Sequence, residues 1–174
     1  MNKSELRKIM INERKEIPNK KELSRIITDK IIKLDNYKNA KVIALYNSLN
    51  DEVDTRELIN KSLDNKIVLL PKVINDKMVF IKINRTTKYV KSKLGILEPI
   101  GDIYYGNIDL IIVPGISFDK KFNRLGFGMG YYDKYLRNKD FYKVGICYYE
   151  QLVDELETSE HDIKMDLVIT EKEF

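Results

Sequence analysis

A polar, glycine-rich loop is the stretch of this sequence best suited to chemistry. It follows an apolar run at Leu110–Val113, which predicts a strand buried on both faces, and Pro114-Gly115 ends that strand. The loop contains Arg124 and glycines at 126, 128 and 130, and a helical pattern begins at Tyr131. Glycines let a ligand approach main-chain N–H groups, while a helix start and an arginine add positive charge. The arrangement favours binding of an anion such as phosphate.

Other interpretations of the same glycines stay open. Taken alone, the glycines could equally form a tight structural turn that needs a positive φ. The dinucleotide fingerprint would need a third glycine where Tyr131 stands, and the loop lacks the lysine that closes a Walker A motif. If the loop binds phosphate, it therefore does so through neither of these two common motifs.

Asp133 follows the loop and would repel a phosphate unless a cation lay between them. Mg²⁺ bound by one or two carboxylates together with phosphate oxygens removes that conflict. The simpler interpretation is that Asp133 stabilises the first turn of its helix through the helix dipole. By itself, the residue favours the simpler interpretation.

A basic stripe is predicted on the first helix. Lys3, Arg7 and Arg14 are separated by 4 and 7 residues, and at 100° per residue they lie within about 40° of one another. Such a stripe could bind a polyphosphate. Without other observations, a solvated face near Glu13 and Glu16 is the favoured interpretation.

The pattern of elements predicts an α/β fold with a mainly parallel sheet and helices on both faces. Asn2 and Glu5 predict a capping box, and Asp54 or Thr55 is expected to cap a later helix. Without repeats or linkers, residues 1–174 are expected to form one domain. Helices are predicted over residues 3–16, 20–34, 55–63 and from 131, and strands over 42–46, 66–70, 78–83, 110–113, 143–148 and 165–169. The strand at 66–70 is expected to end at Pro71, with 78–83 as its hairpin partner.

Composition restricts the compartment and the possible metal sites. Cys147 is the only cysteine and His161 the only histidine, so neither a disulfide framework nor a two-histidine metal site is possible. His161 is expected at the surface or in a cap. No run of about 20 apolar residues and no secretory signal is present, so we expect a cytoplasmic protein without a membrane partner.

Charge raises a nucleic-acid-binding module as an alternative. The net charge is +4, and residues 1–41 carry 12 Lys/Arg against 6 Asp/Glu. The 11 tyrosines, however, fall mostly in strands, turns and the loop–helix junction rather than along a basic stripe. We therefore expect no nucleic-acid partner, and we expect a monomer.

The chain resembles the 5-formyltetrahydrofolate cyclo-ligase family over nearly its whole length. Residues 114–133 match the pattern P-G-x-x-F-D-x-x-x-N-R-L-G-x-G-x-G-Y-Y-D. Lys3 and Arg7 match an N-terminal K-x-x-x-R, Glu52 matches an E-x-x-T, and Asp162 matches an H-D-x-x-x-D. Residues 95–99 resemble a G-I-x-E-P segment. The resemblance implies a Rossmann-like three-layer sandwich.

The same resemblance implies an activity and a set of site residues. The activity is the ATP- and Mg²⁺-dependent conversion of 5-formyltetrahydrofolate to 5,10-methenyltetrahydrofolate. The expected catalytic residues are Arg124 and Glu52, and the expected metal ligands are Asp133 and Asp162. The expected ATP-binding residues are Lys3, Arg7, Arg124, Leu125, Gly126, Phe127, Gly128, Met129, Gly130, Tyr131 and Tyr132. The expected substrate-binding residues are Asn47, Glu52, Phe127, Gly128, Met129, Gly130 and Tyr131.

A different enzyme on a related sheet is the remaining alternative. A sugar-phosphate isomerase or a CoA-transferase-like enzyme would act without ATP. The sequence has no evident pair of nucleophile and base for such chemistry.

Overall fold

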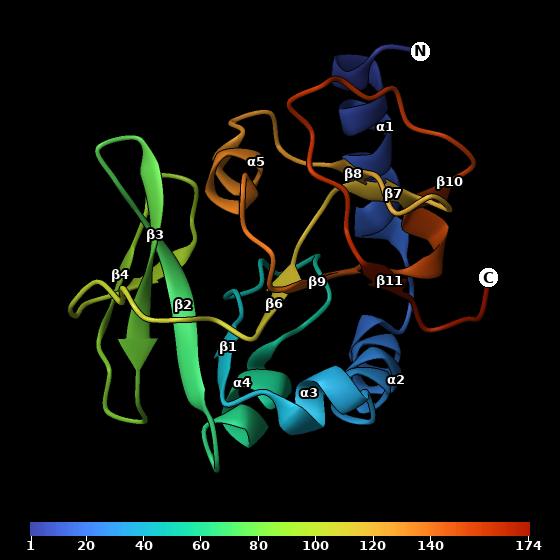
Figure 1. The fold of residues 1–174 in the computed structure, drawn as a ribbon. Coiled ribbons are helices and arrows are strands. Elements are labelled where there is room, and N and C mark those ends of the chain that lie inside the picture. The colour runs from blue at the N-terminus through green and yellow to red at the C-terminus, as the bar shows by residue number, and fades with distance from the viewer.

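The computed structural model describes residues 1–174 and has a six-stranded sheet at its centre (Figure 1). The strands in spatial order are β11 (Leu167–Ile169), β9 (Tyr142–Ile146), β6 (Leu110–Val113), β1 (Val42–Ala44), β2 (Ile67–Ile74) and β3 (Lys77–Ile83). All neighbours are parallel except β2 and β3, which form an antiparallel hairpin. The predicted mainly parallel α/β sheet is confirmed, including its hairpin.

Both faces of the sheet are buried, which explains why the central strands are apolar at every position. Ile43 in β1 and Ile112 in β6 belong to one hydrophobic cluster, whereas their neighbours Ala44 and Ile111 belong to the cluster on the opposite face. Alternate side chains of a strand point to opposite faces, so an uninterrupted apolar run is needed when both faces are covered.

The two faces are covered differently. Helices α2 (Lys20–Ile32), α3 (Asp35–Asn39) and α4 (Arg56–Ser62) contribute Ile27, Ile31, Tyr37 and Leu58 to the first cluster. The opposite face is covered by the short helix α5 (Tyr131–Leu136) and by a small sheet of β10 (Leu152–Val153), β7 (Ser117–Asp119) and β8 (Arg124–Leu125). Strands β4 (Tyr89–Lys91) and β5 (Leu97–Pro99) form a separate pair, and η1 (Tyr149–Gln151) is a 3₁₀ turn.

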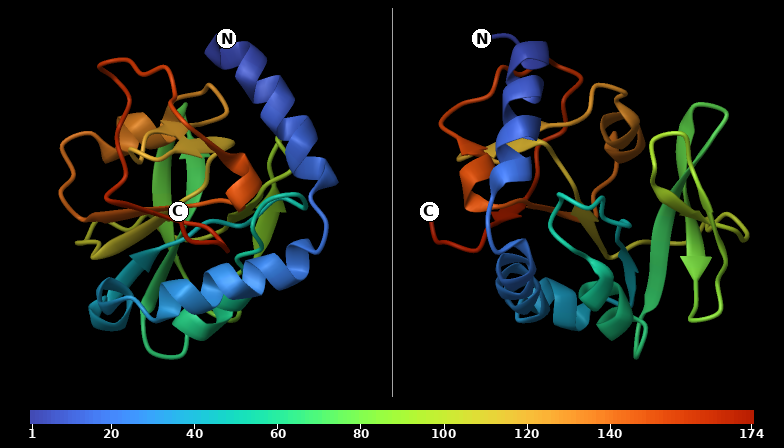
Figure 2. Two further views of the ribbon diagram at one scale, coloured as in Figure 1. Left: turned by 90° about the vertical axis from the view of Figure 1, so that its right-hand side faces the viewer. Right: turned by 180° about the vertical axis from the view of Figure 1, so that it is seen from behind.

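Helix α1 (Lys3–Glu16) lies apart from the other helices, beside the small sheet (Figures 1 and 2). The predicted capping box of Asn2 and Glu5 is present at its start. Met10 packs in a third cluster with Ile116 and Leu125, the latter directly before the glycine loop. The first helix is thus attached to the loop segment rather than to the face of the central sheet.

Two local predictions need correction, and at α4 the structure decides between the two predicted capping residues in favour of Asp54. The chain does not run directly from β6 through a loop to α5, because β7 and β8 form a hairpin between them. Strand β2 continues through Pro71 to Ile74; its pairing with β1 ends at Leu69, so the missing N–H of Pro71 lies beyond the parallel ladder. Thr55 precedes α4 but makes no side-chain cap, and Asp54 instead accepts the Arg56 N–H at 3.0 Å.

The remaining boundaries differ from the predictions at their ends. The second predicted helix ends two residues early, at Ile32, and the short helix α3 that follows it was not predicted. Strands β1, β9 and β11 are shorter than or shifted from the predicted strands. None of the helices combines the length and apolarity that crossing a bilayer requires.

Substitution of Gly145 in β9 by alanine is predicted to destabilise the fold by about 1–3 kcal/mol. The fully buried ring of Phe118 lies against Gly145, and an added Cβ would stand 2.8 Å from its Cζ atom. Urea unfolding would measure the loss. Combining Gly145→Ala with Phe118→Leu should cost less than the sum of the two single changes. Strict additivity would contradict the steric explanation.

Candidate functional site

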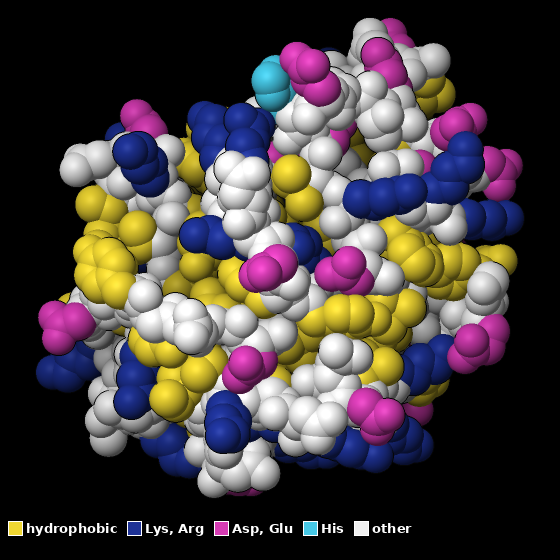
Figure 3. Space-filling model, viewed as in Figure 1, with side chains coloured by type: hydrophobic (Ala, Val, Ile, Leu, Met, Phe, Trp, Pro, Cys, Tyr) yellow, Lys and Arg dark blue, Asp and Glu magenta, His cyan; other side chains and the backbone are white.

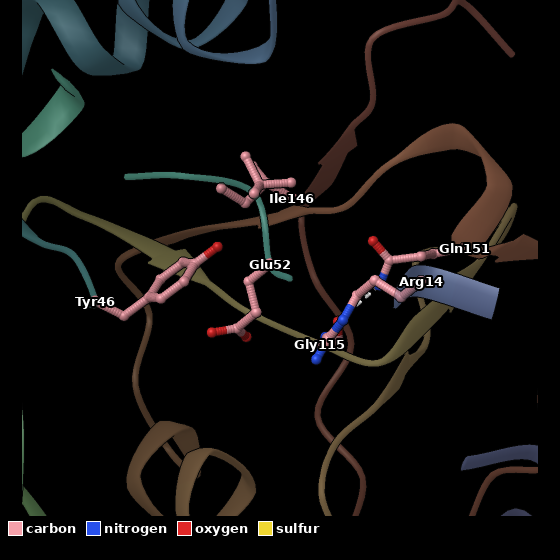
Figure 4. Close-up of a pocket in the computed structure, with 7 residues that line it drawn as sticks. Arg14, Tyr46, Glu52, Gly115, Ile146 and Gln151 are labelled. Atoms are coloured by element: carbon pink, nitrogen blue, oxygen red, sulfur yellow. Dashed lines mark hydrogen bonds between the residues drawn. The ribbon is translucent and has the colours of Figure 1, made fainter. Parts of the chain in front are cut away.

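The carboxyl ends of β1, β6 and β9 meet at one edge of the sheet and form a narrow pocket with helix α1 (Figure 4). Its lining residues are Arg14, Tyr46, Glu52, Val53, Gly115, Ile146 and Gln151. The pocket contains about 160 Å³ outside the atoms, part of it open to solvent, and in this ligand-free form its side chains leave no enclosed space for a water molecule. This edge is where open α/β sheets bind ligands.

Glu52 is a buried carboxyl group at this pocket, with only 7% of its surface exposed. Figure 4 shows Glu52 between Tyr46 and Arg14. Burial raises the pKa of Glu52 to about 7, although the Leu49 N–H and the charges of Arg14 and Arg124 oppose the rise. Its Oε1 accepts that N–H at 2.7 Å. The group can therefore change protonation state near neutral pH.

The loop that carries Glu52 is fixed by buried hydroxyl groups. The Tyr148 hydroxyl donates to the Glu52 carbonyl at 3.0 Å and lies 3.1 Å from the Ser24 hydroxyl. Thr55 donates its hydroxyl hydrogen to the Tyr46 carbonyl at 2.5 Å. The threonine of the E-x-x-T pattern thus anchors the loop to the end of β1, and the glutamate faces the pocket.

Arg124 lies beneath the glycine loop, with 7% of its side chain exposed. Its Nε donates to the Pro114 carbonyl at 2.7 Å, its guanidinium lies 5.0 Å from the Tyr132 ring centre, and Nη1 is 3.9 Å from the Asp133 carboxylate. Burial lowers the pKa of Arg124, and Asp133 opposes that effect. The buried cation is balanced by π electrons, a carbonyl and a carboxylate.

The hairpin before the loop is closed by Asp119, which is fully buried. Its carboxylate accepts the N–H groups of Lys121, Asn123 and Leu156 at 2.9–3.0 Å, and also the Asn123 side-chain amide. These bonds stabilise the turn in which Phe122 has a φ of 70°. The F-D-x-x-x-N part of the sequence pattern is therefore explained by turn geometry.

The glycine loop presents a row of free main-chain donors. No N–H group of residues 126–130 donates a hydrogen bond within the chain. Gly128 and Gly130 adopt positive φ angles of 103° and 71°. Gly126 serves another purpose, because a Cβ there would lie 2.8 Å from Nη2 of Arg124. The loop can therefore offer successive donors to an anion.

The basic stripe of α1 faces this site, so the favoured interpretation as a solvated face is wrong. Lys3 donates to Asp162 at 2.7 Å, Arg7 donates from Nε to the Gly126 carbonyl at 2.7 Å, and Arg14 donates to Asp51 at 3.1 Å. Only 3% of the Arg14 side chain is exposed. The stripe consequently joins three separate segments of the site.

The predicted metal ligands Asp133 and Asp162 both lie near enough to Arg124 for their charges to raise its pKa. The Asp133 Oδ1 accepts the Ile163 N–H at 3.1 Å, and the Asp162 Oδ2 accepts Lys3 and the Ser159 N–H at 3.0 Å. Partial burial would raise the pKa of Asp162, but the hydrogen bonds from Lys3 and Ser159 lower it. Asp162 is thus a carboxylate at neutral pH.

These two carboxylates fit Mg²⁺ only with help from a ligand. No group of three or more His, Cys, Asp or Glu side chains could hold a metal ion by itself. Two carboxylates completed by phosphate oxygens are a usual magnesium environment.

His161 lies at the surface, as expected from the sequence, and is seen in cyan in Figure 3. It contacts Glu160 and Arg137.

Asn47 follows the pocket residue Tyr46 in the chain, and its side chain bonds to another segment. Its amide donates to the Leu97 carbonyl in β5 at 2.9 Å. Glu98, the next residue, accepts the Val73 N–H at 2.9 Å. Asn47 and Glu98 therefore attach the G-I-L-E-P segment to the central sheet. The side-chain amide of Asn47 is used for this structural bond in the ligand-free protein.

Several residues of the site were not assigned by sequence reasoning. Tyr46, Tyr148 and Gln151 lie at the ends of strands, but their types alone do not distinguish pocket residues from core residues. Arg14 carried a usable signal, since it shares a helical face with Lys3 and Arg7. That signal became specific only when α1 was seen to face the pocket.

Comparison with known proteins gives one family. A model of the 5-formyltetrahydrofolate cyclo-ligase family matches residues 1–171. The cyclo-ligase of Mus musculus is 32% identical over 166 residues, covering 85% of this chain and 82% of the relative. That of Mycoplasma pneumoniae is 31% identical over 179 residues, covering 99% and 100%.

Solved structures agree with the sequence comparison. The NMR structure of Aquifex aeolicus 5,10-methenyltetrahydrofolate synthetase matches with a TM-score of 0.88 and 34% identity, over 99% of this chain and 91% of that one. The synthetase of Mycoplasma pneumoniae matches with a TM-score of 0.80 and 30% identity, over 99% and 100%.

The buried carboxyl of Glu52 is predicted to make stability depend on pH. Its pKa rises from 4.5 to about 7 on folding, so the native state binds more protons between these values and loses stability as pH rises through them. Glu52→Gln should therefore gain stability over the wild type by roughly 2 kcal/mol more at pH 8 than at pH 5. Chemical unfolding at both pH values would measure this difference. A stability gap independent of pH would contradict the raised pKa.

Proposed function

This chain belongs to the 5-formyltetrahydrofolate cyclo-ligase family, and on that premise we propose that it converts 5-formyltetrahydrofolate to 5,10-methenyltetrahydrofolate with ATP as the phosphoryl donor. The observation that carries the proposal is the row of free N–H groups at residues 126–130, close to Arg7 and Arg124. This is a site for the phosphates of a nucleotide. The same Arg124 lies near enough to Glu52 for its charge to favour the Glu52 carboxylate.

The chemistry requires activation of a formamide oxygen. That oxygen attacks the γ-phosphorus of ATP, and ADP leaves. N10 then attacks the formyl carbon and loses its proton, and the former formyl oxygen departs within phosphate, leaving the methenyl bridge. Phosphoryl transfer of this kind depends on alignment and on neutralisation of charge rather than on a protein nucleophile.

The residues of the chain have distinct roles in this proposal. The N–H groups of the glycine loop bind phosphate oxygens, and Arg124 beneath the loop balances their charge. Lys3 and Arg7 add positive charge from α1, and Arg7 also fixes the loop through its bond to the Gly126 carbonyl. Phe127, Met129 and Tyr131 border the loop and would contact the nucleotide or the folate ring; Phe127 and Met129 are exposed. Tyr132 stacks against Arg124 and positions it.

Asp133 and Asp162 would hold Mg²⁺, which supplies charge neutralisation to the triphosphate when bound. The second carboxylate oxygen of Asp133 makes no hydrogen bond and is available as a ligand. Asn47 and Glu52 would contact the folate, with Glu52 orienting it.

The other functions considered from the sequence gain no support. The basic N-terminal region suggested a nucleic-acid partner, but three of its cations, Lys3, Arg7 and Arg14, make contacts within the protein, with Asp162, the Gly126 carbonyl and Asp51. An isomerase or CoA-transferase-like enzyme would not need the row of N–H donors together with a carboxylate pair.

Nucleotide binding and turnover provide the main test. Addition of Mg·ATP and 5-formyltetrahydrofolate should produce methenyl absorbance, and omission of ATP should abolish the increase. Calorimetry should detect binding of Mg·ATP with competition by ADP. Absence of both the heat and the ATP-dependent absorbance would refute the proposal.

Asp133→Asn is predicted to raise the Mg²⁺ concentration needed for half-maximal activity by at least about tenfold, since one hard anionic ligand becomes a neutral amide. Asn retains an oxygen that can accept the Ile163 N–H, so the fold should persist. Steady-state rates over a Mg²⁺ titration would measure the change. Asp140→Asn, at an exposed carboxylate, is the control. An unchanged Mg²⁺ requirement would remove Asp133 from the metal site.

A further inference from the structure

The buried side chain of Arg14 has an N–H donor without a hydrogen-bond partner. Its Nη1 is the only buried side-chain nitrogen or oxygen without a hydrogen-bond partner. The side chain is 3% exposed, and its single ion pair uses Nε, which lies 3.1 Å from the Asp51 carboxylate. A buried N–H without an acceptor destabilises a protein, so this arrangement requires another explanation.

Arg14, which carries this free donor, lines the same pocket as Glu52. Arg14 enters from α1, and Glu52 enters from the loop after β1 (Figure 4). Two opposite charges in a pocket with little water interact more strongly than they would at the surface. The Phe127 ring, with its centre 5.9 Å from the Arg14 guanidinium carbon, lies against the Arg14 side chain.

The other charged and titratable groups around Glu52 leave Arg14 a distinct role. Arg124 from β8 also stabilises the carboxylate, but its own contacts go to Pro114, Tyr132 and Asp133. Asp51 opposes ionisation of Glu52. The remaining neighbours are the hydroxyl groups of Tyr46 after β1, Tyr132 in α5 and Tyr148 after β9.

We propose that Arg14 is a positioning residue that keeps Glu52 in its carboxylate form for recognition of the folate ring. The inference rests on the proposed function. The pterin part of a folate carries an amide N–H and an amino group side by side, and a carboxylate can accept from both at once. A protonated carboxyl would present an O–H in place of one acceptor. Arg14 therefore controls how much of the protein is ready to bind substrate.

Titration in the ligand-free protein tests this role without any assay of activity. Burial raises the pKa of Glu52 to about 7, and Arg14 acts against that rise. In ¹³C NMR of glutamate-labelled protein, the Glu52 signal is identified by its loss in Glu52→Gln. Arg14→Gln should move its midpoint upward by about one pH unit or more, and Arg14→Lys by less.

A second variant tests the same role in the opposite direction and does not remove the buried arginine. Asp51→Asn removes the negative charge that opposes Glu52 and frees Nε of Arg14, so the Glu52 midpoint should move downward. The control for Arg14→Gln is Arg25→Gln, which removes a positive charge from an exposed arginine on α2. It should leave the Glu52 midpoint in place. If Arg14→Gln does not fold, the shift in Asp51→Asn decides.

Substrate binding provides the second measurement. By calorimetry, Arg14→Gln should bind 5-formyltetrahydrofolate at least about threefold more weakly than wild type at pH 7.5, because a one-unit rise in the Glu52 midpoint lowers its carboxylate fraction by that factor, and most of that loss should disappear by pH 9. An equal loss at every pH, or a Glu52 midpoint that neither variant moves, would overturn the role of Arg14. Failure of the wild type to bind 5-formyltetrahydrofolate at all would instead refute the proposed function, and the NMR titration separates the two outcomes.

Discussion

The docking of α1 against the carboxyl edge of the sheet is the interaction on which the site depends. Three cations on one helical face contact three segments that are far apart in sequence: Asp162, the Gly126 carbonyl and Asp51. The helix also packs against the β7–β8 hairpin, where Met10 and Leu125 belong to one hydrophobic cluster. Because these contacts are spread along 12 residues of a rigid helix, the acidic pair, the glycine loop and the Glu52 loop are held in a fixed mutual arrangement.

Burial of charge gives the site its chemical character. Arg124 and Arg14 are almost fully buried, and Glu52 lies in the same region with a pKa raised to about 7. Charges in such surroundings interact strongly and cost stability unless they are paired. These buried charges lie at the edge of the sheet where ligands bind, whereas the core elsewhere is apolar. Buried charges concentrated in one place are expected at a functional site.

The glycines illustrate how far a sequence pattern specifies a structure. Their presence predicted an open loop, and Gly128 and Gly130 indeed take positive φ angles. The purpose of Gly126 was not predictable, because it makes room for a guanidinium that folds back from Arg124. The hairpin of β7 and β8 was also missed, since its strands of three and two residues are too short for a periodic pattern, and Asp119 closes it through main-chain bonds.

The sequence by itself determined the parallel sheet, the first helix with its cap, and the glycine loop followed by Asp133, because each depends on periodicity or on local backbone chemistry. Only the tertiary structure decided which way the stripe of Lys3, Arg7 and Arg14 faces. Spacing places side chains on one side of a helix, but the direction of that side depends on packing. The pocket of Arg14 and Glu52 also depends on the tertiary structure. Folding buries these two residues, which are 38 positions apart in the sequence, in one pocket where their charges interact.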